Sequence, residues 1–134
     1  MAALSRNKGK VGEREIAREL SDLTGWTVRR KVRQLDGESD LEGVPGWSVE
    51  VKRHASAMPG DIAAWWAQAH AQAEASGPDV VPVLFFRADR REWRAVFPVA
   101  IMLGLQPQER PGYEWTCECS LQAWAALARE RHAG

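Results

Sequence analysis

Two carboxylates and a lysine in the first half of the chain have the spacing of a hydrolytic site. Residues 47–52 alternate apolar and polar side chains, which predicts a short strand. Side chains alternate along a strand, so Glu50 and Lys52 would lie side by side on one face. Nine residues separate Asp40 from Glu50, and the glycines and proline among them favour a turn. We therefore expect Asp40 to fold back beside Glu50.

This grouping predicts metal-assisted chemistry. Two carboxylates about 4 Å apart repel by roughly 4 kcal/mol at an effective dielectric near 20. Either one of them takes up a proton or a cation lies between them. Mg²⁺ binds one or two carboxylates and keeps its other positions for water and phosphate oxygens, and a nearby lysine can assist the attacking water. The chemistry is that of phosphodiester hydrolysis; the alternative is a solvated strand face that carries a Glu–Lys pair.

A third acid lies on a helix predicted for residues 11–24. Ile16, Leu20 and Leu23 share one face of this helix, and Glu13 projects close to Leu20 on that apolar stripe. One interpretation is a first-turn glutamate that the helix dipole favours and whose head reaches solvent. The other is that Glu13 points into the same pocket as Asp40 and Glu50.

These residues carry a family resemblance. Asp40 followed by Glu50-Val51-Lys52 resembles the D…ExK core of the PD-(D/E)xK nucleases, although Ser39 stands where that superfamily often has proline. The segment from Arg6 to Glu15, with its basic residues, Gly9 and Glu13, resembles the start of the archaeal-type Holliday junction resolvases in that superfamily. The order of these features matches over residues 5–98.

The resemblance implies a role for each residue. Four residues would hold Mg²⁺, or Mn²⁺ as a substitute, the last through its carbonyl: Glu13, Asp40, Glu50 and Val51. Lys52 would position or activate the attacking water, and Ser39 and Gln72 would support the site. A four-way junction offers two symmetric cuts, so a homodimer with two active sites fits the task.

The basic residues gather near the N-terminus. The whole chain is neutral, with 18 Lys and Arg against 18 Asp and Glu, but residues 1–35 hold nine basic and four acidic residues, a net charge of +5. Such a surface beside an acidic pocket is typical of a nuclease; the alternatives are an ordinary solvated surface or a charge-protected edge strand. The candidate DNA contacts are Arg6, Lys8, Lys10, Arg14, Arg29, Arg30, Lys31, Arg33 and Arg53.

The chain of 134 residues has the size of one domain. We expect a flexible basic arm at residues 1–10, a helix at 11–24 and strands at 26–33, near Asp40 and at 47–52. A polar loop at 53–57, a helix at 59–76, and strands at 80–86 and 92–99 would follow. Residues 100–134 would form a C-terminal extension with a last helix at 120–131. The pattern is helix–strand–strand–strand–helix–strand–strand, and the resemblance implies an α/β, restriction-endonuclease-like fold with a central mixed sheet.

The location is predicted by what the sequence does not contain. No apolar run approaches the ~20 residues of a membrane span, and the basic, polar N-terminus has no signal-peptide pattern. We expect no membrane partner and a cytoplasmic protein of a bacterial, archaeal or phage-infected cell.

Three functions remain open. The first is a structure-selective, metal-dependent endodeoxyribonuclease that nicks four-way DNA junctions in recombination or repair. The second is another PD-(D/E)xK endonuclease, restriction-like or reparative, that acts on linear or flapped DNA. The third is a DNA-binding module without catalysis.

Overall fold

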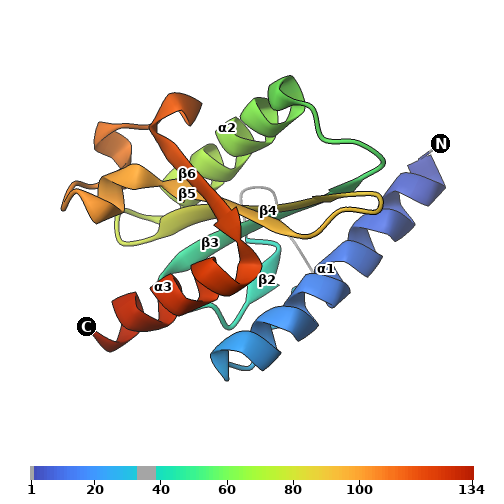
Figure 1. Cartoon of the computed structure of the whole chain (residues 1–134), viewed down its shortest axis with the longest axis horizontal. Coiled ribbons are helices and arrows are strands. Elements are labelled where there is room, and N and C mark those ends of the chain that lie inside the picture. The colour runs from blue at the N-terminus through green and yellow to red at the C-terminus, as the bar shows by residue number, and fades with distance from the viewer. Residues whose placement is uncertain (1, 33–38) are drawn as a thin grey trace.

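The protein has three layers, a twisted sheet between one helix on one face and two on the other (Figure 1). The computed structural model describes residues 2–32 and 39–134, with side chains from residue 9 onward. Helix α2 (Pro59–Ser76) covers one face, and helices α1 (Ala2–Thr24) and α3 (Leu121–Ala133) cover the other. None of the helices in these described ranges is long and apolar enough to cross a membrane.

The central sheet is mixed. Strands β3 (Trp47–His54), β4 (Val81–Ala88), β5 (Arg94–Pro98) and β6 (Thr116–Ser120) lie in that order. The β3–β4 pair is parallel, with α2 as the crossover that a parallel pair requires, and the other pairs are antiparallel. A short ladder of β1 (Arg29–Arg30) and β2 (Leu41–Glu42) lies beside the β3 edge.

The alternation of side chains along the strands divides the core into two clusters. Val49, Val51 and Phe85 face α1 and α3, where the Trp124 ring meets Phe85 edge-on at 4.8 Å between ring centroids. Leu84 and Phe86 face α2. Because Glu50 and Lys52 alternate with the two valines, they lie on the α2 side of β3.

The expected α/β fold and element order are confirmed. The helix predicted at residues 59–76 is present with these bounds, and the last helix begins after Ser120, whose Oγ accepts a hydrogen bond from the Ala123 amide at 3.1 Å. Leu121 and Trp124 on the apolar stripe of this last helix are buried in the core.

Three predicted boundaries were wrong. Helix α1 begins at Ala2 and not near residue 11, so residues 2–10 continue the helix and form no separate arm; alanine, leucine, lysine and arginine are good helix formers. The strand expected at 26–33 is reduced to β1 in the described residues, since the Val28 amide donates to Ser21 Oγ on α1 at 3.0 Å. Strand β3 continues through Arg53 and His54, where we expected a loop, because both pair in register with β4.

Candidate active site

Asp40 lies beside β3, as the turn formers predict. Its amide donates to the Val49 carbonyl at 2.8 Å, and its carboxylate Oδ2 accepts a hydrogen bond from the Val51 amide at 2.7 Å. Ser39 fastens the same segment, because its Oγ accepts from the Val49 amide at 2.9 Å and donates to the Leu41 carbonyl at 2.7 Å. A hydroxyl at the position where the superfamily often has proline therefore ties the Asp40 segment to the β3 edge.

Glu50 and Lys52 form a pair on this strand. Lys52 Nζ lies 3.3 Å from Glu50 Oε1, and the Glu50 side chain is only 5% exposed. A buried carboxylate needs such a partner, because desolvation penalises its charged form. The expectation that Glu50 and Lys52 lie side by side on one face of the strand is confirmed.

The electrostatics of the two acids are coupled. Burial and the negative charge of Glu50 raise the pKa of Asp40 to about 7, against the lowering effect of the Val51 amide. Burial also raises the pKa of Glu50, although Lys52 opposes this shift. Two carboxylates that both resist ionisation mark a site of concentrated negative charge, which is a property of functional sites.

Glu13 belongs to the same electrostatic group. Its side chain is 14% exposed, and its charge raises the pKa of both Asp40 and Glu50. Its Oε2 lies 3.2 Å from Nε of Arg30, which comes from β1. Glu13 is thus largely shielded from solvent and lies within electrostatic reach of both acids, with Arg30 as its ion-pair partner.

Gln72 of α2 supports β3 through hydrogen bonds. Its side chain is buried, and its Nε2 donates to Ser48 Oγ and to the Val49 carbonyl, both at 3.2 Å. The Val49 carbonyl is also the acceptor for the Asp40 amide. Gln72 thereby holds the strand that carries Glu50 and against which Asp40 is bonded.

The donor chemistry of the site fits a hard cation. Among the described residues, no group of three or more His, Cys, Asp and Glu is arranged to hold a metal ion. Asp40 and Glu50 nevertheless offer carboxylate oxygens, the ligands that Mg²⁺ prefers, and their raised pKa values show a cost of negative charge that a cation would relieve.

The basic residues predicted to bind DNA have different environments. Lys10, Arg14 and Arg29 are exposed, Lys31 is half-buried, and Arg30 is engaged by Glu13. Arg53 forms an ion pair with Asp89. Arg33 and the side chains of Arg6 and Lys8 lie outside the part of the chain that the structure describes.

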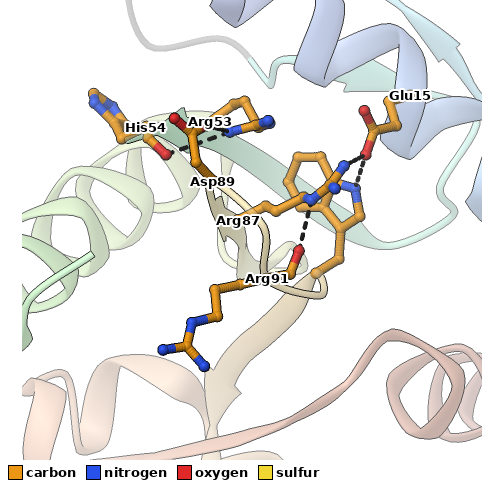
Figure 2. Close-up of polar contacts among 7 residues, drawn as sticks. Glu15, Arg53, His54, Arg87, Asp89 and Arg91 are labelled. Carbon is orange, nitrogen blue, oxygen red and sulfur yellow. Dashed lines mark hydrogen bonds and ion pairs between the residues drawn. The ribbon is translucent and has the colours of Figure 1, made fainter. Parts of the chain in front are cut away.

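One polar cluster was missed by the sequence analysis. Arg87 on β4 pairs with Glu15 of α1, whose Oε1 also accepts a hydrogen bond from Trp93 Nε1 at 2.7 Å (Figure 2). Glu15 and Arg87 are 72 residues apart, so no local pattern joins them. Only the packing of α1 across the sheet brings them together.

An acid beside a strand that carries Glu-x-Lys, on a mixed sheet flanked by helices, defines the PD-(D/E)xK nucleases. The sequence model of a family described as phage putative PDDEXK endonuclease matches residues 4–118, and the chain belongs to this family. Membership makes the protein a nuclease of restriction-endonuclease-like fold. It implies DNA as the substrate, and the family usually uses divalent metals.

Other comparisons are more distant. The solved structure of Hjc, a Holliday junction resolvase from the archaeal hyperthermophile Archaeoglobus fulgidus, is similar over 90% of this chain and 95% of that chain. The sequences are 15% identical and the TM-score is 0.48. No curated protein matches the sequence.

Proposed function

We propose that the protein is a divalent-metal-dependent endonuclease that nicks four-way DNA junctions at two symmetric positions as a homodimer. The observation that carries the nuclease site is the fixing of Asp40 beside Glu50 and Lys52 by the Val51 amide. The junction preference is supported by the sequence order of a basic, glycine-containing segment, Glu13, Asp40 and Glu-x-Lys, which resembles the resolvases.

The residues divide the work of hydrolysis. Asp40, Glu50 and the Val51 carbonyl would hold the metal, Mg²⁺ or Mn²⁺, which when bound supplies Lewis-acid activation of water and phosphate. Glu13, which pairs with Arg30 and forms no three-acid group with them in the described residues, would join them when the metal binds. Lys52 orients the attacking water and offsets the negative charge that builds up on the phosphate oxygens. The Val51 amide and Gln72 keep the Asp40 segment and β3 in place. Water adds to phosphorus, and one backbone P–O bond breaks.

The test is cleavage of a labelled four-way junction beside a matched linear duplex, with EDTA, Mg²⁺ or Mn²⁺. We expect paired nicks in the junction that require the metal. Lys52→Ala and Asp40→Asn should each lower the rate by about 100-fold or more, the size expected when a group that stabilises charge in the transition state is removed. Glu42→Gln, at an exposed acid two residues from Asp40, is the matched control and should cut normally. Full cleavage by Lys52→Ala or Asp40→Asn would show that the site is assigned wrongly.

The alternative substrate, linear or flapped DNA, is supported by the family itself, which is known as phage endonucleases and not as junction resolvases. Competition separates the two: excess linear duplex should displace a bound junction poorly from a junction-selective enzyme. Equal displacement would assign the same site to linear DNA.

Metal binding and assembly are tested without cleavage. Calorimetry should detect Mg²⁺ binding to the wild-type chain in the absence of DNA, with weaker binding by Asp40→Asn. Sedimentation equilibrium should give twice the mass of the chain. No Mg²⁺ binding together with no cleavage of any DNA would favour a non-catalytic DNA-binding module instead.

A further inference from the structure

The turn between β4 and β5 holds an arginine in a strained conformation. The Arg91 amide donates to the Ala88 carbonyl at 3.1 Å, which closes a four-residue turn with Arg90 at its third position. Arg90 has φ 64°, and in the described ranges it is the only residue other than glycine with a positive φ. Such a position normally takes glycine or asparagine. An arginine at such a position carries a conformational cost, which makes its side chain a candidate for a functional contact.

Polar contacts fix the turn on its β3 side. Arg53 pairs with Asp89 and also donates to the His54 carbonyl at 3.3 Å (Figure 2). The Asp89 amide donates to the Ala55 carbonyl at 3.3 Å. The acid within the turn is therefore already balanced by a cation.

A second set of contacts fixes the turn on its β4 side. Arg87 Nε donates to the Arg91 carbonyl at 2.7 Å, and the guanidinium of Arg87 pairs with Glu15. The Arg91 side chain points away from Glu15, on the opposite side of the turn (Figure 2). Glu92 is also exposed, and after burial and Glu15 its charge contributes to the raised pKa of Glu19 on α1. These contacts hold the β4–β5 turn in place, and the side chains of Arg90 and Arg91 on it are exposed.

The β4–β5 turn lies beyond the end of β4 that pairs with the Lys52 end of β3. Phe86 is the register partner of Lys52, so their side chains share one face of the sheet. Phe86 also lines a hollow of about 630 Å³, to which Arg91 contributes. The other charged residues of this hollow are Asp89, which pairs with Arg53, Arg94 and Glu118, which pair with each other, and Glu92. The turn follows Phe86 within a few residues along β4, so its arginines lie on the same side of the molecule as the end of β3.

We propose that Arg90 and Arg91 bind backbone phosphates of the DNA flanking the scissile bond. This proposal rests on the proposed nuclease function and assigns a second contact to the same substrate. Guanidinium groups suit phosphate because they donate two parallel hydrogen bonds. Contacts of this kind position a strand without reading its sequence.

The first test measures DNA affinity by fluorescence anisotropy over a series of salt concentrations, with both a linear duplex and a four-way junction. The variants carry Lys52→Ala to prevent cleavage. We expect Arg90→Ala with Arg91→Ala to weaken binding of both DNAs by roughly tenfold and to reduce the salt slope by about 2, one for each lost phosphate contact. Arg129→Ala, at an exposed arginine on α3, is the matched control and should leave both quantities unchanged.

The second test uses the strain itself. Arg90→Gly should raise the melting temperature by about 3–5 °C, because glycine adopts a positive φ without steric cost, and should still weaken DNA binding. A purely structural arginine would give a lower melting temperature. Unchanged affinity and salt slope in the arginine variants would overturn the phosphate contact alone, whereas failure of the Lys52→Ala parent to bind any DNA would overturn the nuclease function as well.

Discussion

At the scale of single residues, ionisation of the Asp40 carboxyl group destabilises the folded state. Burial and Glu50 raise its pKa to about 7 from an ordinary value of 3.8. The folded state therefore binds this proton more tightly than the unfolded state does. The free energy of unfolding falls as the pH rises from about 4 to about 7 and levels off above that range. Each pKa unit corresponds to about 1.4 kcal/mol, so the loss is on the order of 4 kcal/mol.

Asp40→Asn should remove this penalty, since an amide does not ionise and its oxygen can still accept the Val51 hydrogen bond. We expect the variant to be more stable than wild type at pH 8 in EDTA, with the gain shrinking towards zero near pH 4. Urea unfolding at several pH values measures the difference. A gain that stays constant with pH would contradict the raised pKa.

The residues of the site that the sequence predicted are those joined by local rules. Strand alternation places Glu50 beside Lys52, and the turn after Asp40 returns the chain to β3. The partner of Glu13 was not predictable, because the pair with Arg30 depends on how α1 lies against β1. For the same reason, the sequence indicated that Glu13 is unusual without choosing between solvent and pocket.

At the scale of elements, α1 and β3 approach each other closely at Gly12. A Cβ at this glycine would lie 2.7 Å from Cβ of Arg53 and 3.7 Å from the Trp93 ring. Real Cβ atoms do not come so close, so only glycine fits here without a shift of backbone. This contact sets the distance between the helix that carries Glu13 and the strand that carries Glu50.

Gly12→Ala should destabilise the protein by about 1–3 kcal/mol through overpacking and should lower cleavage, because Glu13 moves relative to β3. Gly9→Ala is the matched control on the same helix: a Cβ there meets nothing within 4 Å. It should stabilise the helix by about 0.5–1 kcal/mol. Urea unfolding checks both values, and changes of the same sign in the two variants would count against the close approach.

The extents of the elements were less predictable than their order. Charged residues in α1 obscured the helical pattern before residue 11, although the backbone is helical from Ala2. The alternation of residues 26–33 suggested a long strand, but Ser21 takes the Val28 amide. Tertiary hydrogen bonds of this kind cannot be inferred from local periodicity.

At the scale of the whole molecule, the last helix joins the core and does not stand apart as an extension. Trp124 is fully buried and packs edge-on against Phe85 and Trp47. Helix α3 also packs against α1. The helix that carries Glu13 is thus supported by residues more than a hundred positions away.

Trp124→Ala should destabilise the protein by about 3–5 kcal/mol, the usual cost of removing a buried tryptophan. Trp124→Phe should cost less, because it keeps most of the ring and removes an indole N–H that has no hydrogen-bond partner among the described residues. Gln122→Ala, at an exposed position on the same helix, should change stability by less than about 0.5 kcal/mol. Chemical denaturation followed by circular dichroism ranks the three, and a mild Trp124→Ala would mean that α3 is dispensable to the core.

The bond between the Val51 amide and Asp40 Oδ2 also supplies a reporter. An amide proton held by a carboxylate changes its resonance when that carboxylate is protonated or drawn towards a cation. In an isotope-labelled sample, the Val51 signal should follow the arrival of metal or DNA at the site in real time, before any strand is cut.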